Sequence, residues 1–308
     1  MSATAPIVFE PLFMERVWGG RRLENLYGKR LPLGVRVGES WEIVDRDDFQ
    51  SVVHDGVYRG VTLNELWTQH RAEIFGEGLP DTPHFPLLFK LLDCQDRLSV
   101  QVHPPASVAA QFGGEPKTEM WFVMHTALDS DLFTGLKHGV TRQQFDDALQ
   151  SGHVADLIHR LPTHSGDAFF IPSGRIHAIG AGNVIFEVQQ NSDTTYRVFD
   201  WNRLGLDGKP RDLHIAESLA SINFDDPEPG LAQAQGESVV QCEYFHVEKW
   251  SIEDVRSTGT ESAFAIFTVL EGGIACGGRH FVPGDLFLVP VRSGLELRGT
   301  GTVLRTTL

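Results

Sequence analysis

Short apolar segments recur along most of the chain, many with every second residue apolar, and glycine, proline or aspartate separates them. Apolar segments of this length, bounded by turn residues, are typical of β-strands. The pattern starts near Ile7, continues to Gly56 and then returns in separate stretches. The most clearly predicted strands are 39–44, 50–54, 85–92, 98–103, 167–171 and 184–190. Residues 239–308 are predicted to form strands and turns alone.

Three stretches are predicted to be helical. Thr62 and Thr141 each stand before such a stretch, and Glu65 or Gln144 follows three residues later. This spacing is that of a capping box, in which the two side chains satisfy free backbone groups at the start of a helix. The predicted helices are 63–75, 142–160 and 213–222. With 31 glycines, 16 prolines and 20 phenylalanines among 308 residues, the chain is expected to be mostly β, with a few short helices.

A weak internal repeat indicates two related β-domains. The segment GDAFFIP at Gly166–Pro172 resembles GDLFLVP at Gly284–Pro290. Upstream of these, 120–124 has a counterpart in 265–270. One such match could arise by chance between turn–strand–turn segments, but two in the same order favour duplication.

The boundary between the two predicted domains lies in an acidic, polar segment rich in proline, glycine and glutamine. Residues 225–238 have the composition of a linker or a long surface loop. We therefore predict a first domain at 1–224, with helical insertions, and a C-terminal β-domain at 239–308.

The chain is acidic, with a formal net charge of −15 and a pI near 5.2. Nucleic acid and anionic membranes are not expected as partners, because proteins that bind them usually carry a basic patch. An anionic small molecule would need local arginine or lysine side chains. The first residues do not resemble a signal peptide, and no apolar run is long enough to span a bilayer. The three cysteines lie far apart, which favours free thiols and a cytoplasmic location: Cys94, Cys242 and Cys276.

Four residues of the first predicted domain have side chains suited to a metal ion. Gln101 and His103 are two apart on a predicted strand, so they share one face. Glu119 begins the next apolar strand, and His177 follows a tight turn. Imidazole, carboxylate and amide ligands without a thiolate suit Zn²⁺, Mn²⁺, Fe²⁺ or Co²⁺ and leave room for water or substrate. After Pro290 no histidine or carboxylate stands at the matching place, so the second domain is expected to lack metal ligands.

The spacing Gly166-x₅-Pro172-x-Gly174-x₂-His177 resembles the second sequence motif of the cupins, including the position of its metal-binding histidine. The first cupin motif usually has two histidines one residue apart and a glutamate shortly after. Here Gln101 replaces the first histidine, and residues 104–118 place Glu119 further along the chain.

These departures are similar to those of the class I mannose-6-phosphate isomerases, and the chain resembles their short bacterial form over most of its length. The matching stretches are 37–43, 85–91, 98–104, 116–121, 166–177 and 189–200. The C-terminal domain matches only loosely. The resemblance implies two cupin-type jelly-roll β-barrels and an aldose–ketose isomerase acting on mannose 6-phosphate and fructose 6-phosphate. It also implies one zinc ion per chain, with other divalent transition metals as alternatives.

The resemblance implies roles for individual residues. Zinc would be held by Gln101, His103, Glu119 and His177, with Gln101 the weakest donor, and Arg197 would be catalytic. Glu187 is our hypothesis for the base that moves a proton between C2 and C1; a structural carboxylate paired with a basic neighbour is the alternative. Lys117 and Ser99 are predicted to contact the substrate, although a solvated lysine at a strand end is an equal alternative for Lys117.

Two other function classes remain open from the sequence. A cupin oxygenase would use a similar metal cage to hold iron and activate O₂, and metal identity and oxygen uptake would distinguish it. A non-enzymatic sugar-binding protein with two cupin domains would be expected to lack metal ligands in both domains, whereas the first domain of this chain has a complete set. A related sugar could also be the preferred substrate, and the oligomeric state is left undetermined.

Overall fold

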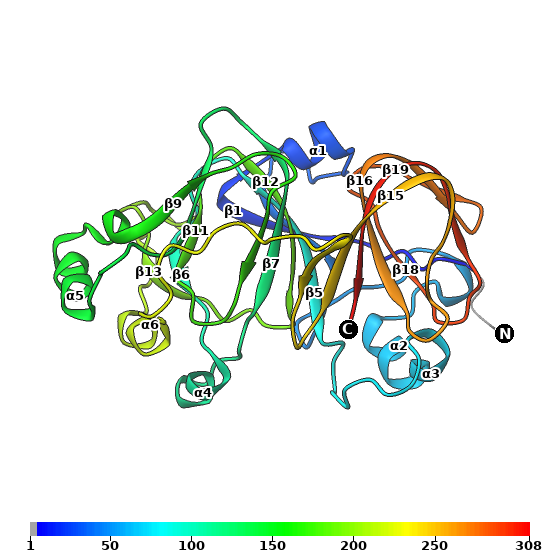
Figure 1. Ribbon diagram of the computed structural model, residues 1–308, viewed down its shortest axis with the longest axis horizontal. Coiled ribbons are helices and arrows are strands. Elements are labelled where there is room, and N and C mark those ends of the chain that lie inside the picture. The colour runs from blue at the N-terminus through cyan, green and yellow to red at the C-terminus, as the bar shows by residue number, and fades with distance from the viewer. Residues whose placement is uncertain (1–4) are drawn as a thin grey trace.

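The computed structural model describes residues 5–308 and places them in two strand-rich units that lie side by side (Figure 1). Strands β1 to β13 form the first unit and β14 to β19 form the second. The mostly β fold with few short helices is confirmed and is consistent with cupin-type barrels. Within the described residues, no helix combines the length and the apolar character needed to cross a membrane.

Neighbouring strands of each sheet are antiparallel. The first sheet contains, in spatial order, β1 (Leu12–Gly20), β2 (Val37–Ile43), β5 (Leu87–Cys94), β12 (Asn183–Gln190), β7 (Glu119–Thr126) and β10 (Ala168–Ile171). The second contains β13 (Tyr196–Phe199), β6 (Val100–Val102), β11 (His177–Ile179), β8 (Asp131–Leu136) and β9 (Ile158–Pro162). The third contains β14 (Ser238–Gln241), β15 (His246–Ser257), β19 (Glu296–Thr307), β16 (Ala265–Cys276) and β17 (Arg279–Phe281), with β18 (Leu286–Val289) paired to β16. A short hairpin joins β3 (Asp45–Arg46) and β4 (Phe49–Gln50).

The helices are short and lie between strands. They are α1 (Arg22–Tyr27), α2 (Leu63–Gln69), α3 (Arg71–Ile74), α4 (Ala106–Ala109), α5 (Arg142–Ser151) and α6 (Ile215–Ser221), with 3₁₀ turns at Gly56–Tyr58, Ala110–Phe112 and Val154–Leu157. Both predicted capping boxes are present, with Thr62 before α2 and Thr141 before α5. The predicted helix 63–75 is interrupted at His70, and α1 was not predicted.

The predicted helix at 142–160 is wrong in its second half. Helix α5 ends at Ser151, and Gly152 adopts a left-handed conformation with φ of 75°. Such a residue ends a helix, because only glycine takes up this conformation without a steric penalty. The chain then enters β9, whose backbone pairs with β8. Pairing with a strand distant in sequence therefore overrides the local helical pattern. The predicted strand 50–54 is likewise reduced to the end of β4 and isolated bridges.

The first sheet sends alternate side chains to opposite sides, and this alternation positions the polar residues. On β12, Phe186 and Val188 belong to a large apolar cluster that they share with Leu304 of the third sheet. Ile185 faces the other way, into a cluster shared with Ile179 of the second sheet. Because side chains on a strand alternate, Glu187 points with Ile185 into the space between the first two sheets.

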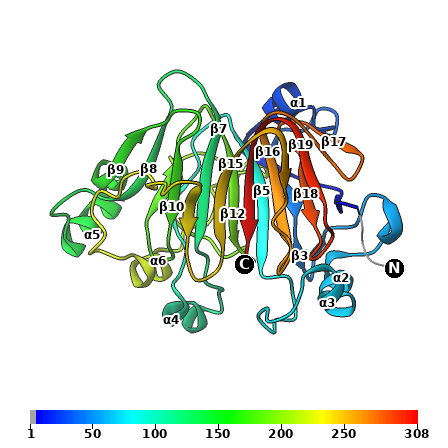
Figure 2. The same ribbon diagram turned by 45° about the vertical axis from the view of Figure 1, so that its right-hand side comes forward.

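The outer face of the first sheet packs against the C-terminal unit. Figure 2 shows β5 and β12 beside β15 and β19. The buried cluster at this contact includes Phe89 of β5, Val247 of β15 and Leu304 of β19. Burying apolar surface from both units contributes to the stability of each.

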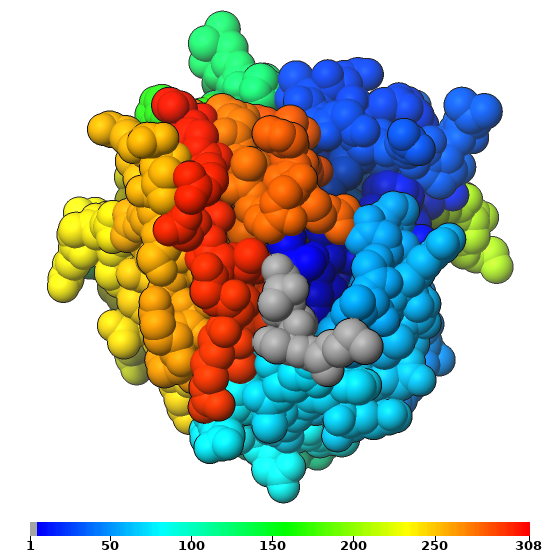
Figure 3. Space-filling view, turned by 90° about the vertical axis from the view of Figure 1, so that its right-hand side faces the viewer, coloured from blue at the N-terminus to red at the C-terminus, as the bar shows by residue number. Residues whose placement is uncertain are grey.

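Early parts of the chain also pack on the C-terminal unit. Figure 3 shows the N-terminal segments, in blue and cyan, against the C-terminal strands in orange and red. Ile7 exchanges two backbone hydrogen bonds with Leu288, each of 2.8 Å, and Val291 donates to the carbonyl of Ile74 at 2.9 Å. The predicted division at 225–238 therefore does not separate all contacts, and that domain boundary stays a prediction.

The two copies of the internal repeat form the same local structure. Gly166 donates to the carbonyl of Val123, and Gly284 donates in the same way to Val269. In each copy the next residue is an aspartate, and its side chain accepts a hydrogen bond from the backbone N–H three residues earlier. The strands that follow, β10 and β18, pair antiparallel with β7 and β16. These shared bonds support duplication of a β unit.

Candidate metal centre and active site

The second sheet places three of the predicted site residues in one row. Its register pairs Gln101 of β6 with His177 of β11 on one side and with Arg197 of β13 on the other. Directly opposed residues of neighbouring strands point to the same face, with Cβ atoms about 5 Å apart. This row therefore carries Arg197, Gln101 and His177 in that order. His103 follows the end of β6.

Glu119 reaches the same place from the first sheet, at the start of β7. One ligand atom from each of His103, Glu119 and His177 lies within 4.8 Å of the other two, and all three residues are buried. Residues distant in sequence are thus brought together as a compact set of possible metal ligands.

Both histidines use Nδ1 for a hydrogen bond to the backbone, so Nε2 is the nitrogen that can bind a metal. Nδ1 of His103 lies 2.9 Å from the carbonyl of Thr194, and Nδ1 of His177 lies 2.9 Å from that of Arg175. A carbonyl only accepts, so each Nδ1 carries the proton and each Nε2 keeps its lone pair. Nε2 of His103 and both oxygens of Glu119 are buried without a hydrogen-bond partner. Buried polar atoms without a partner are costly, and a divalent metal would satisfy all of them.

The electrostatics keep these residues in metal-binding protonation states. Burial, together with the charge of Lys117, lowers the pKa of His103 to about 4, and burial lowers that of His177. Burial opposes ionisation of Glu119, but Lys117 and the histidines outweigh it and hold its pKa well below the usual range. Two neutral imidazoles and one carboxylate are therefore present at neutral pH.

Gln101 borders this cluster. Its amide Nε2 lies 3.2 Å from Nε2 of His177, and its Oε1 accepts a hydrogen bond of 3.2 Å from Ser99. Rotating the amide by 180° exchanges its oxygen and nitrogen, which would turn the oxygen toward His177. Gln101 lies where a fourth ligand is needed; its role as a ligand stays a prediction.

A cavity of about 540 Å³ opens beside this cluster. Five predicted site residues line it, namely Ser99, Gln101, Lys117, Glu187 and Arg197. Lys117 joins the cavity to the cluster, because its Nζ lies 3.2 Å from Glu119. The structure thus brings all eight predicted site residues into one region.

Glu187 is held by two partners. Its Oε2 accepts a hydrogen bond of 2.8 Å from Nε1 of Trp121, and its Oε1 lies 3.2 Å from Nζ of Lys90. The register of the first sheet explains this, since Glu187 is directly opposite Trp121 on one side and Lys90 on the other. Lys90 was not singled out from the sequence, although a lysine inside the apolar run FPLLFKLL could have identified it.

Glu39 forms another part of the cavity wall. It accepts hydrogen bonds from Arg16 and, at 2.7 Å, from Nε1 of Trp41. Burial raises the pKa of Glu39, but the charges of Lys90 and Arg16 outweigh this and lower it to about 2.

We expect Glu39→Gln to lower the free energy of unfolding at pH 7 by up to about 3 kcal/mol. The folded-state pKa lies below the unfolded value, so this stabilisation is present above pH 4.5 and is lost as the pH falls toward 2. Denaturant unfolding at several pH values should show that, as the pH falls from 4.5 toward 2, the variant loses less of its free energy of unfolding than the wild type does. Glu15→Gln, at an exposed position of the same wall, is the control. Identical pH profiles for wild type and Glu39→Gln would contradict this assignment.

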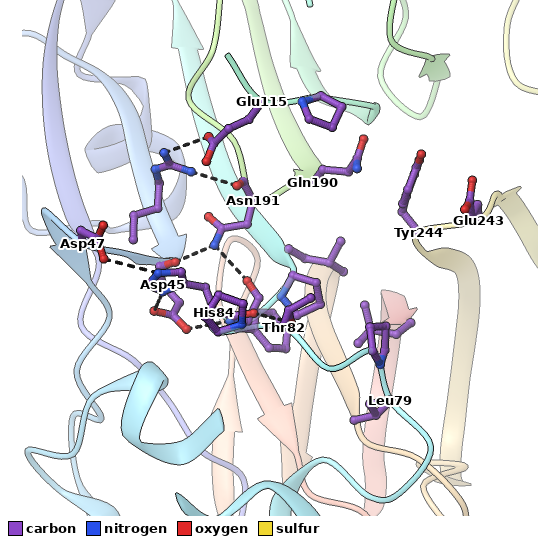
Figure 4. Close-up of a pocket in the computed structure, with 18 of the residues that line it drawn as sticks. Asp45, Asp47, Leu79, Thr82, His84, Glu115, Gln190, Asn191, Glu243 and Tyr244 are labelled. Carbon is purple, nitrogen blue, oxygen red and sulfur yellow. Dashed lines mark hydrogen bonds and ion pairs between the residues drawn. The ribbon is translucent and has the colours of Figure 1, made fainter. Parts of the chain in front are cut away.

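A larger cavity, of about 710 Å³, lies elsewhere (Figure 4). Two pairs of its polar groups already contact each other: Asp45 lies 2.9 Å from His84, and Arg46 lies 2.9 Å from Glu115. Across residues 5–308, His103, Glu119 and His177 form the one cluster of histidine, cysteine or acidic residues that could hold a metal. The smaller cavity is therefore the candidate active site.

Comparisons with known proteins agree with this geometry. Residues 8–113 match the catalytic domain of phosphomannose isomerase type I. The mannose-6-phosphate isomerase ManA of Bacillus subtilis (strain 168) is 36% identical over 304 residues, covering 94% of this chain and 95% of that protein. A mannose-6-phosphate isomerase of Streptococcus mutans is 36% identical over 297 residues, covering 91% and 92%.

The fold leads to the same relatives. A crystal structure of the mannose 6-phosphate isomerase from Bacillus subtilis superposes with a TM-score of 0.88 and 32% identity, covering 99% of this chain and 100% of that one. Relatedness over nearly the full length of both chains shows that the chain belongs to the type I phosphomannose isomerase family.

Proposed function

We propose that this enzyme interconverts mannose 6-phosphate and fructose 6-phosphate by proton transfer between C2 and C1, with zinc as its metal. One observation carries the proposal. The buried His103–Glu119–His177 cluster, with free ligand atoms, lies beside a cavity that also contains a fixed carboxylate and several cations. The relatives named above support the choice of substrate.

The metal would be held by His103, Glu119 and His177, with Gln101 as a fourth ligand. Nitrogen and oxygen ligands without a thiolate suit zinc and do not exclude other divalent ions. When bound, such an ion supplies positive charge that polarises a carbonyl oxygen and stabilises the negative oxygen formed as C2 loses its proton.

Glu187 is proposed to move the proton. It is buried in the cavity wall, and Lys90 and Trp121 fix its carboxylate. A fixed carboxylate can take the proton from C2 of the open-chain sugar and return it to C1, because the two carbons are adjacent. The same residue serves both directions of the reaction.

Arg197 and Lys117 are proposed to orient the substrate oxygens. Arg197 lies next to Gln101 in the cross-strand row, and Lys117 contacts Glu119. Both cations line the cavity beside the cluster, where negative charge develops on O1 and O2. Ser99, two residues before Gln101, is proposed to donate a hydrogen bond to the sugar.

We further propose that the enzyme works in the cytoplasm. Cys94, Cys242 and Cys276 are all free thiols, which suits a reducing compartment.

The purified protein should convert mannose 6-phosphate into fructose 6-phosphate and consume no oxygen. A coupled assay for fructose 6-phosphate, run beside an oxygen electrode, measures both. Formation of an oxidised sugar with oxygen uptake would support the oxygenase instead, and no turnover of any sugar would favour the binding protein.

A further inference from the structure

Residues 104–118 separate two of the candidate metal ligands in the sequence, and in the structure they leave the first unit and return to it. Helix α4 lies on the outgoing part, and Figure 1 shows it projecting from the strands. Most residues from 106 to 113 are exposed, whereas Lys117 and Thr118 are buried. The returning end of the 104–118 segment is therefore the part that the fold holds beside the metal cluster.

Several contacts join this returning end to the residues that follow β12. The backbone N–H of Thr118 donates to Oε1 of Gln190 at 2.8 Å, and the N–H of Gln190 donates to the carbonyl of Thr118 at 3.0 Å. Arg46 contacts both parts from the side of the larger cavity. It lies 2.9 Å from the carboxylate of Glu115 and donates to the carbonyl of Asn191 at 2.9 Å (Figure 4). The two segments are thus held together on both sides.

Thr194 contacts both the returning end and a metal ligand. Its Oγ1 accepts a hydrogen bond of 2.9 Å from the backbone N–H of Glu115. Its carbonyl accepts the bond of 2.9 Å from Nδ1 of His103, which leaves Nε2 of that histidine free for a metal. Thr194 does not line the active-site cavity, so its hydroxyl is placed to hold protein groups rather than the sugar.

Gly114 lets the returning end approach this closely. A Cβ atom at this position would lie 2.9 Å from Cγ2 of Thr194 and 2.6 Å from Oη of Tyr196. Both distances are shorter than carbon makes without displacing its neighbour, and Tyr196 is itself buried. A larger residue at 114 would therefore push the segment away from Thr194.

We propose that Thr194 is a positioning residue that sets the affinity for the metal. Through its hydroxyl it holds the returning end of the 104–118 segment, and through its carbonyl it orients His103. Glu119 follows that segment directly, so both ligands depend on the same contact. Ligands fixed before the ion arrives bind it more tightly, because less conformational freedom is lost on binding. This inference rests on the proposed function, which places a divalent ion at these ligands.

Thr194→Val keeps the shape of the side chain but removes the acceptor. We expect it to raise the dissociation constant for zinc about three- to tenfold, since one hydrogen bond is lost. Thr194→Ser keeps the hydroxyl and should bind zinc within about twofold of the wild type. Gly114→Ala should weaken binding about tenfold or more, because the whole contact is displaced. Titration of the metal-free proteins against a chelator of known affinity measures this. At saturating zinc, KM for the sugar should be unchanged in Thr194→Val, because no contact with the sugar is lost.

Two variants in the second unit control for a general loss of stability. Thr258 is buried, and its Oγ1 donates to the carbonyl of Leu295 at 2.9 Å, so Thr258→Val removes a comparable bond far from the metal cluster in the sequence. A Cβ at Gly273 would meet no atom within 4 Å, so Gly273→Ala is the control for Gly114→Ala. Thermal unfolding of each protein accompanies the titrations, and we expect Thr258→Val to melt earlier but to bind zinc as the wild type does.

Unchanged zinc affinity in both Thr194→Val and Gly114→Ala would overturn the proposal. So would an equal loss of affinity in Thr194→Val and Thr258→Val, or in Thr194→Val and Thr194→Ser. A wild type whose zinc affinity depends on the Thr194 hydroxyl but which isomerises no sugar would contradict the proposed function and leave the role of Thr194 standing.

Discussion

Replacing His177 with alanine is expected to remove the bound metal and to lower kcat/KM on the order of a thousandfold. His177 is fully buried, and its Nδ1–H is bonded to the carbonyl of Arg175, so its Nε2 is committed to the cluster. Without that nitrogen, only His103, Glu119 and the weaker donor Gln101 remain to hold the ion, so we expect it to bind weakly. Elemental analysis of the purified variant and steady-state kinetics measure the two losses.

His164→Ala is the control for this variant. His164 lies in the turn before β10 with a side chain 77% exposed, so its loss should change neither metal content nor rate. Thermal unfolding checks that both variants are folded. A His177→Ala protein that keeps a full equivalent of metal and full activity would remove this residue from the centre.

Replacing Glu187 with glutamine is expected to lower kcat by about 10²–10⁴-fold while the metal content stays unchanged. Glutamine keeps the shape and can still accept from Trp121, but it cannot take a proton from carbon. Kinetics with metal analysis separate this effect from loss of the ion. Exchange of the C2 proton with solvent deuterium should disappear with the activity.

Glu187→Gln also breaks the buried ion pair with Lys90, and this will lower the free energy of unfolding. A variant that breaks a second buried pair is therefore needed as a control. Lys29 and Glu42 are 2.7 Å apart and similarly buried, and neither lines the active-site cavity. Glu42→Gln should lower the melting temperature without lowering kcat. Full turnover by metal-loaded Glu187→Gln would instead support the structural carboxylate that the sequence also allowed.

Local patterns predicted much of the fold correctly. The capping boxes at Thr62 and Thr141 are set by neighbouring residues, and both are present in the structure. The strand pattern placed Gln101 correctly on β6, and its face could be inferred because side chains alternate along a strand. The second half of the helix predicted at 142–160 failed because β9 is held by β8, a partner that local sequence does not reveal.

In the candidate site, too, features set by local sequence were predicted and features set by distant pairing were missed. The spacing of the second cupin motif selected His177, and the family resemblance added His103 and Glu119; the fold brings these three residues together. Lys90 was missed because its contact with Glu187 depends on the register of the first sheet. Glu187 is distant from Lys90 in the sequence, so no local pattern shows that the two residues pair.

The most direct test of a metal-dependent isomerase is conversion of mannose 6-phosphate into fructose 6-phosphate by the purified wild type in three states. The protein is assayed as isolated, after chelation to a metal content near zero, and after addition of one equivalent of zinc. We predict that activity is lost on chelation and restored by zinc. Full isomerase activity in the protein shown to be free of metal would contradict the central claim.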